Sequence, residues 1–184
     1  LMISRSIFIL GKLLSASMKI DREIIRLREE LELVRYYVEL QNVRFNHCIQ
    51  LEIDVPDELM DIGVNKFLLQ PLVENSIVHG AMFPQPLTIR IEARAEDGGV
   101  SIIVADNGKG LPEHAFDTKE ALGNPESATE EAWEKSGGIG LTNIQERIHL
   151  YFGQQFGLSL QAGQEGGTVV HIRIPFQREV TQHA

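Results

Sequence analysis

The sequence predicts an α+β fold in which a mixed, mostly antiparallel sheet is covered on one face by helices and preceded by an N-terminal helical segment. Three observations support this prediction. The first 45 or so residues place apolar side chains at helical spacing, several later segments have the alternation or composition of strands, and two of those segments are joined by a tight turn. With 184 residues and 43% hydrophobic content, the chain can bury one full core.

Residues 1–45 are predicted to be helical because their apolar residues recur in steps of three and four. One stripe consists of Ile3, Ile7, Leu10 and Leu14, and a second, heptad-like stripe consists of Ile20, Ile24, Leu27, Leu31, Val34, Val38 and Gln41. Two interpretations of the second stripe stay open: the helix pairs with another helix, or it lies on its own domain. The longest apolar run near the start, Ile7 to Leu10, is far shorter than the roughly 20 residues of a membrane span.

Residues 46–178 are predicted to form the main domain, and residues 179–184 a tail. The alternation from Ile49 to Ile53, closed by Pro56, predicts the first strand. The elements that follow are a helix over Asn65–Met82, strands over Leu87–Ala95 and Val100–Ala105, a helix over Gly138–Tyr151, and strands over Gly157–Gln161 and Thr168–Ile174. Glu96–Gly99 joins the second and third strands as a hairpin turn, because glycine tolerates positive φ, so these two strands are antiparallel.

The segment between Leu111 and Gly137 differs from its surroundings. It contains proline, glycine, serine and seven acidic residues with little periodicity. A loop of this length inside a domain is usually functional or disordered.

Charge and cysteine content exclude several classes of protein. The formal net charge of -9 repels phosphate backbones, which argues against general nucleic-acid binding, so any anion must be held locally. Cys48 is the only cysteine, which rules out an internal disulfide and fits a reducing cytoplasm.

Asn75 and His79 form the first polar cluster, on one stripe of the predicted helix beside its leucines. A carboxamide oxygen can occupy one position around a Mg²⁺ ion whose other ligands are phosphates and water. His79 could bind phosphate, or it could simply be a satisfied histidine near a helix end. Glu74 lies about 100° around the helix from Asn75 and is a solvent-facing or a catalytic carboxylate.

Two further clusters suit a purine nucleotide. Asp106 follows a strand in the sequence ADNGKGLP, where a carboxylate can accept from the amino group of adenine and repels the carbonyl of guanine; Gly108 and Gly110 allow close approach of the backbone to a ring. The stretch SGGIGLTNIQER opens a helix, and the first amides of a helix can bind phosphate. Taken alone, each of these patterns also fits an ordinary turn or connection.

The order of the clusters is more specific than any one of them. A helix with asparagine, a strand ending in Asp-x-Gly-x-Gly, a long loop, a Gly-x-Gly helix and Gly167-Thr168 resemble the N, G1, G2 and Gly-Thr boxes of the Bergerat-type ATPases. Within that superfamily, the segments ELELVRYYVELQNVRF, LQPLVENSIVHG and GGIGLTNIQERIHLYFG resemble the LytS/YehU class of sensor histidine kinases. The resemblance covers about residues 1–175 and implies a two-layer α/β sandwich.

The resemblance also implies a role for each matching residue. Asn75 would bind Mg²⁺, and Asn75 with His79 would serve transfer of phosphate from ATP. Asp106 would bind the adenine amino group. The remaining residues implied to contact ATP are Gly108, Gly110, Gly138, Ile139, Gly140, Leu141 and Thr168. Residues 111–137 would be a lid over the nucleotide.

The chain departs from the resembled families at two points. Gyrase-type hydrolases carry a glutamate base four residues before the asparagine, where this chain has Pro71, so phosphate transfer is favoured over ATP hydrolysis. The Pro-His-Phe-Leu-Phe-Asn motif of the phosphorylated histidine is absent. We therefore expect the chain to be a fragment that begins after the acceptor helix, with residues 1–45 as the remnant of a dimerisation region.

The resulting prediction is a catalytic domain of a two-component histidine kinase. It would transfer the γ-phosphoryl group of ATP to a histidine outside this segment, and thence to an aspartate of a response regulator. The full-length protein would be a homodimer with this region in the cytoplasm and with any membrane anchor in segments not included here. Two alternatives stay open: a nucleotide-dependent interaction module without phosphotransfer, and a serine kinase of the anti-sigma-factor type.

Overall fold

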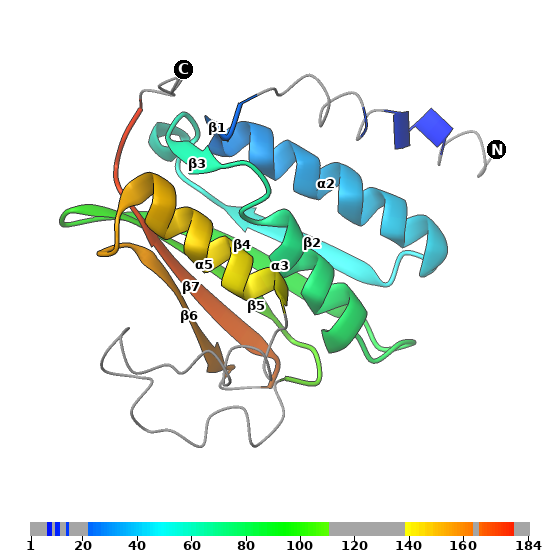
Figure 1. The fold of residues 1–184 in the computed structure, drawn as a ribbon. Helices are drawn as coiled ribbons and strands as arrows, with labels where there is room; N and C mark the ends of the chain where they lie inside the picture. The colour runs from blue at the N-terminus through cyan, green and yellow to red at the C-terminus, as the bar shows by residue number, and fades with distance from the viewer. Residues whose placement is uncertain are drawn as a thin grey trace.

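The protein forms two layers, a five-stranded sheet and a layer of helices on one of its faces (Figure 1). The computed structural model describes residues 7, 8, 10, 11, 14, 22–110, 139–163 and 166–178. The predicted lid and tail, as well as Ile3 and Ile20, lie outside these residues. The predicted α+β class is confirmed.

The sheet has the strand order β2-β4-β5-β7-β6. Its members are β2 (Ile49–Asp54), β4 (Leu87–Glu96), β5 (Gly99–Asp106), β6 (Gly157–Ala162) and β7 (Thr168–Ile174). Only the β2–β4 pair is parallel, and the other three pairs are antiparallel, so the predicted mixed, mostly antiparallel sheet is confirmed. The predicted hairpin joins β4 to β5, where Glu96 pairs with Gly99 and Gly98 has a φ of 82°.

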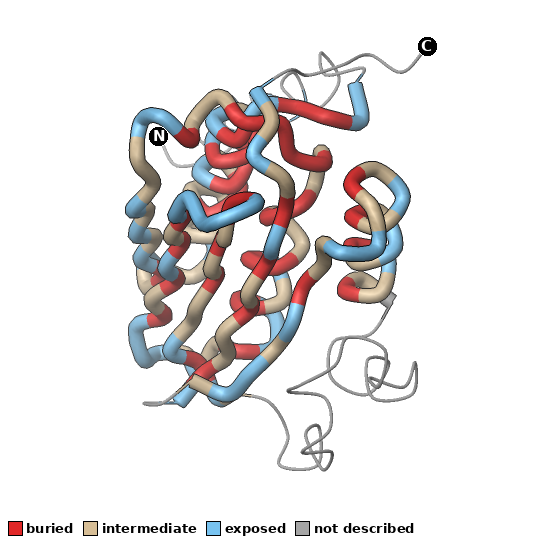
Figure 2. Tube along the Cα trace, turned by 90° about the vertical axis from the view of Figure 1, so that its left-hand side faces the viewer, coloured by how far each residue is buried: buried red, intermediate tan, exposed pale blue. Residues whose placement is uncertain are grey.

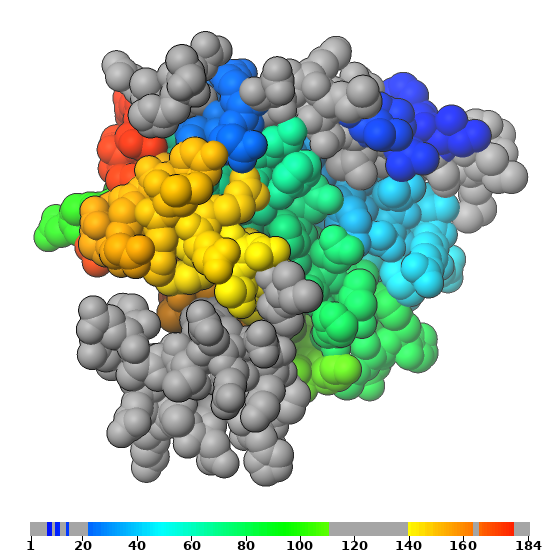
Figure 3. Space-filling view, viewed as in Figure 1, coloured from blue at the N-terminus to red at the C-terminus, as the bar shows by residue number. Residues whose placement is uncertain are grey.

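Buried and more exposed side chains alternate along the strands, so the helices cover one face of the sheet. Leu87, Ile89, Ile91 and Ala93 of β4 are buried, whereas the residues between them are more exposed. Figure 2 shows this alternation of buried and exposed positions along the strands. The buried side chains face α2 (Leu27–Arg44), α3 (Gln70–Asn75) and α5 (Ile139–Phe152), which lie side by side over the sheet (Figure 3).

The N-terminal helix prediction is partly wrong. Ile24–Arg26 is a strand, β1, which pairs antiparallel with β3 (Gly63–Asn65), and α2 begins only at Leu27. Two consecutive β-branched isoleucines favour the extended conformation when a partner strand is present. The apolar stripe of α2 is buried in the core of the same domain, at Leu27, Leu31, Val34 and Val38. This part of the stripe therefore follows the second interpretation, a helix that lies on its own domain.

The helix predicted over Asn65–Met82 is also shorter than expected. Asn65 belongs to β3, Phe67 has a left-handed φ of 59°, and α3 starts only at Gln70. Pro71 fits this start, since proline is tolerated in the first turn of a helix and disfavoured in its interior. After Asn75 the chain continues as a π-helical turn, Ser76–Gly80.

The N-terminal stripe is described at only a few positions. Ile7, Leu10 and Leu14 are helical and exposed. Among the described residues, no helix is both long enough and apolar enough to span a membrane. A short 3-10 helix, Asp57–Leu59, completes the described elements between β2 and β3.

Candidate functional site

Asp106 is the centre of the candidate site. It ends β5, and its carboxylate is held by three segments that are far apart in the sequence. Oδ1 accepts hydrogen bonds from the backbone N–H groups of Gly108 at 2.9 Å and Thr168 at 3.3 Å, while Oδ2 accepts from the Ser76 hydroxyl at 2.8 Å. The structure therefore brings together three predicted elements: the asparagine helix, the end of β5 and the start of β7.

Close contacts between glycines make this convergence possible. A Cβ added at Gly108 would lie 2.5 Å from the carbonyl oxygen of Gly80, and the Lys109 N–H donates to that same oxygen at 2.8 Å. A Cβ at Gly167 would lie 1.9 Å from the Asp106 carbonyl oxygen, and Gly167 has a φ of 76°. Only glycine fits at these two positions, because any side chain would push the backbone segments apart.

Gly110 also packs its backbone closely against another glycine of the site. Its φ is 75°, and a Cβ there would lie 3.2 Å from the carbonyl oxygen of Gly167. The glycines of the Asp-x-Gly-x-Gly sequence thus serve the packing of the backbone around Asp106, in addition to the predicted approach of a ring.

Asn75 is the last residue of α3 and is half-buried, whereas His79 lies in the π-helical turn and is exposed. Short π-helical turns are rare and often occur at functional sites. Within the described ranges, no group of three or more His, Cys, Asp or Glu side chains could hold a metal ion. A Mg²⁺ ion at Asn75 would therefore take most of its ligands from phosphate and water, as Mg²⁺ commonly does.

The beginning of α5 is the predicted phosphate site. Ile139 is the first described residue of the helix, and among the described residues a Cβ added at Gly140 would meet no atom outside its own helix within 4 Å. Leu141 is buried and anchors the first turn to the core. Gly138 lies outside the described residues. The phosphate prediction for this end of α5 rests on its amides, because the first amides of a helix lack partners within the helix.

Two residues of this region were not predicted from the sequence. Ser76 follows Asn75 directly, and a hydroxyl beside the predicted metal ligand was an available signal. Glu30 is fully buried in α2 and accepts hydrogen bonds from the backbone N–H groups of Phe67, Leu69 and Gln70. Its sequence signal was weak, because Glu30 lies beside the apolar stripe, three residues after Leu27 and one before Leu31. Burial raises the pKa of Glu30, and the three amides and Arg147 partly oppose this rise.

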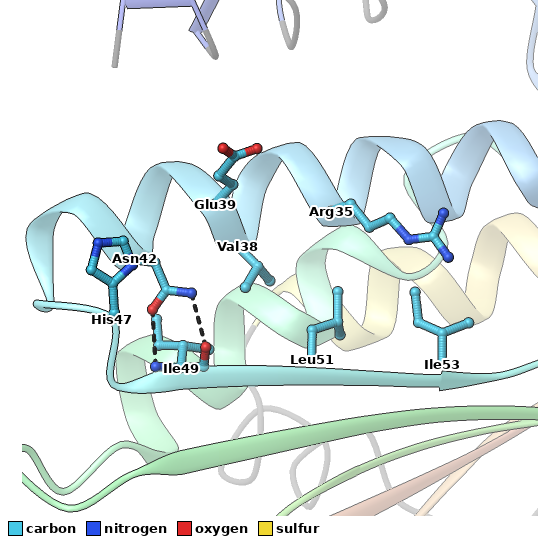
Figure 4. A pocket seen from close by; sticks show the side chains of 8 residues that line it. All are labelled: Arg35, Val38, Glu39, Asn42, His47, Ile49, Leu51 and Ile53. Carbon is cyan, nitrogen blue, oxygen red and sulfur yellow. Dashed lines mark hydrogen bonds between the residues drawn. The ribbon is translucent and has the colours of Figure 1, made fainter. Parts of the chain in front are cut away.

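A groove of about 380 Å³ lies elsewhere, between α2 and β2 (Figure 4). The Asn42 side chain crosses one end of it, donating to the Ile49 carbonyl at 2.8 Å and accepting from the Ile49 N–H at 2.9 Å. The residues that line the groove are Arg35, Val38, Glu39, Asn42, His47, Ile49, Leu51 and Ile53. None of the predicted nucleotide residues is among them, so the chemistry around Asp106, and not this groove, identifies the candidate site.

Comparisons with known proteins show the family of the chain. Residues 65–178 match the family described as histidine kinase-, DNA gyrase B- and HSP90-like ATPase, and residues 2–49 match the family described as histidine kinase. Among curated proteins, the chain is 36% identical over 97% of its length to the sensor histidine kinase YesM of Bacillus subtilis. It is 32% identical over 90% of its length to an uncharacterized sensor-like histidine kinase of Staphylococcus epidermidis. The chain spans only 28% and 31% of the lengths of these two relatives.

Solved structures show the same fold at low sequence identity. The catalytic domain of histidine kinase ThkA aligns with a TM-score of 0.58 and 21% identity, over 85% of this chain and 97% of that one. The ATP-binding domain of PrrB from Mycobacterium tuberculosis aligns with a TM-score of 0.53 and 16% identity, over 85% and 98%. These likenesses establish the fold.

Proposed function

Because the chain belongs to the family of histidine kinase-, DNA gyrase B- and HSP90-like ATPases, we propose that it is the ATP-binding catalytic region of a two-component sensor histidine kinase. It transfers the γ-phosphoryl group of ATP to a histidine outside this chain, and thence to an aspartate of a response regulator. The match of residues 2–49 to the histidine kinase family favours this role over a gyrase-like ATPase or an anti-sigma-type serine kinase.

The observation that carries the proposal is the fixed carboxylate of Asp106. Its three hydrogen bonds orient both oxygens, and Oδ2 receives only one of them, so this oxygen can accept another donor. The exocyclic amino group of adenine is such a donor, whereas guanine presents a carbonyl there. Recognition by a pre-oriented group costs little ordering on binding, which suits an adenine-specific site.

The phosphate side of the site is proposed from Asn75, His79 and the start of α5. Asn75 would place its carboxamide oxygen on Mg²⁺, His79 would hydrogen-bond a phosphate, and the amides near Gly140 and Leu141 would bind the phosphates. When bound, Mg²⁺ would neutralise charge that develops on the phosphates.

Pro71 explains why transfer is favoured over hydrolysis. It occupies the position four residues before Asn75, in the first turn of α3, where gyrase-type hydrolases carry a base. Proline cannot activate water. Phosphoryl transfer to a better nucleophile needs mainly positioning and charge neutralisation, which the proposed groups provide.

The partners and the location of the protein are part of the same proposal. The acceptor is a histidine on the phosphoacceptor helix of the same kinase, within a homodimer of the full-length protein. This region lies in the cytoplasm, where ATP and a response regulator are available, and any membrane anchor belongs to other segments.

The experiment measures binding and transfer separately. Calorimetry with ADP and GDP, each with Mg²⁺, tests the site; we expect ADP to bind and GDP to bind much more weakly. The chain is then incubated with labelled ATP, alone and with an added acceptor segment of a LytS/YehU-type kinase. Acid-labile phosphate on the added segment supports the proposal. Binding without transfer would leave an interaction module, and strong self-labelling of the chain alone would contradict an external acceptor.

A further inference from the structure

Glu30 joins α2 to the entrance of α3 through three hydrogen bonds. The Phe67 N–H donates to its Oε2 at 3.0 Å, and the Leu69 and Gln70 N–H groups donate to its Oε1 at 2.9 and 3.2 Å. The side chain has 0% exposure. Glutamate is almost never fully buried unless its polar atoms are paired, and the three amides supply that pairing here.

The segment that Glu30 holds needs such support. Phe67 has a left-handed φ of 59°, which is disfavoured for a bulky side chain. Leu69, the residue before α3, makes no side-chain hydrogen bond that would cap the helix. The amides at the start of α3 are therefore satisfied from another element, and that element is α2.

The other end of this segment is also fixed. Ser76 donates its hydroxyl to Asp106, so the chain from Phe67 to Ser76 is attached to α2 at one end and to β5 at the other. Asn75 lies within it, next to the Asp106 attachment and five residues after Gln70. Its position therefore depends on both attachments.

We propose that Glu30 is a positioning residue for the metal and phosphate side of the nucleotide site, because it fixes α3 and hence the carboxamide of Asn75 relative to α2. This inference rests on the proposed function. Glu30 lies in the segment that matches the histidine kinase family, whereas its three amides and Asn75 lie in the segment that matches the ATPase family. The contact is thus a direct connection between the two matched segments, and a displacement of α2 is transmitted to Asn75 through it.

The test separates the part of ADP binding that depends on Mg²⁺ from the part that does not. Calorimetry measures the affinity for ADP with Mg²⁺ and with a chelator, in the parent chain, in Glu30→Gln and in the control Glu32→Gln, which changes an exposed glutamate of the same helix. The neutral amide accepts at only one of its two positions, so at least one buried N–H is left unpaired. We expect Glu30→Gln to lower the affinity for Mg·ADP by about tenfold and the metal-free affinity by less than about twofold. The control leaves both unchanged.

A double-mutant cycle distinguishes positioning from a general loss of stability. If Glu30 acts through Asn75, then adding Glu30→Gln to Asn75→Ala causes no further loss of Mg·ADP affinity. A loss of the same size in the Asn75→Ala background would overturn the inference. So would equal losses with and without Mg²⁺, or an unchanged Mg·ADP affinity in Glu30→Gln.

The parent chain provides a test that does not depend on a variant folding. Because coupling between two sites is reciprocal, Mg·ADP should slow hydrogen exchange at the amides of Phe67, Leu69 and Gln70 more than metal-free ADP does at equal saturation. Equal protection by both ligands would overturn the inference. If the parent bound no adenine nucleotide at all, the proposed function itself would fail, and this inference with it.

Discussion

Replacing Asp106 by asparagine separates its structural role from its proposed role in adenine recognition. In the parent, Oδ1 accepts from the backbone amides of Gly108 and Thr168, and Oδ2 accepts from the Ser76 hydroxyl. An asparagine can keep its oxygen towards the two amides and place its NH₂ group towards Ser76. The Ser76 oxygen can accept from that NH₂ group, because its single hydrogen has a second acceptor 3.2 Å away, the Leu72 carbonyl.

This exchange conserves the number of hydrogen bonds within the protein. We expect the free energy of unfolding to change by about 1 kcal/mol or less, the difference between charged and neutral acceptors. The expected change in nucleotide affinity is larger, because a donor would replace the acceptor proposed to bind the adenine amino group. The lost charged hydrogen bond corresponds to about 2–3 kcal/mol, or roughly 30- to 160-fold in affinity.

Two measurements check the expectation for Asp106→Asn. Urea unfolding gives the stability of the parent and the variant, and calorimetric titration with ADP and GDP gives their affinities. We expect the preference for ADP over GDP to shrink or reverse, since an NH₂ group can donate to the guanine carbonyl. The reasoning would be refuted if the variant bound ADP as tightly as the parent does, or if its loss of stability exceeded its loss of binding energy.

The other predictions concern the phosphate side, the glycine contacts and Glu30. Asn75→Ala should leave the thermal unfolding temperature nearly unchanged and remove the increase in ADP affinity that Mg²⁺ causes. Glu74→Ala changes an exposed neighbour and is the control. If Asn75→Ala retained the increase, the metal role of Asn75 would be excluded. Gly140→Ala should keep the stability in urea or raise it by up to about 1 kcal/mol, and it should weaken ADP binding. Gly167→Ala should destabilise the fold, because its Cβ would lie 1.9 Å from the Asp106 carbonyl oxygen. The reverse pattern would contradict our assignment. Burial raises the pKa of Glu30, so its contribution to the free energy of unfolding is complete below its ordinary pKa of 4.5 and is lost as pH rises through the raised pKa. The stability of the parent minus that of Glu30→Gln, measured in urea, should therefore fall over this pH range. A constant difference would argue against the raised pKa.

The sheet could be predicted from the sequence because its signals are local. Alternation along Ile49–Asp54 and the glycine turn between β4 and β5 depend on neighbouring residues only, and the structure confirms both. The parallel pairing of β2 with β4 had no such signal, because it joins segments separated by the whole of α3. For the five strands of this sheet, existence is thus a local property of the sequence, and strand order is not.

The helix ends were mispredicted for a related reason. The apolar spacing continues through Ile24 and through Phe67, but tertiary contacts decide both positions: pairing with β3 extends Ile24–Arg26, and Phe67 takes a left-handed conformation that no spacing rule predicts. Similarly, Asp106 could be identified by its sequence neighbours, whereas its bond to Ser76 exists only because β5 ends beside α3.

The length of α3 has a consequence for the whole site. It has six residues and the π-helical turn that continues it has five, and an isolated helix of this combined length is only marginally stable in water, so α3 does not determine its own position. Its position comes instead from tertiary contacts: the burial of Leu72 and Val73 in the core, and the hydrogen bonds at its two ends, Glu30 from α2 and Asp106 from β5. A short helix held in this way can carry Asn75 at a defined place and still respond when one of its supports moves. In a long, self-supporting helix, Asn75 would depend less on α2, and the proposed metal side of the site would respond less to a change at Glu30.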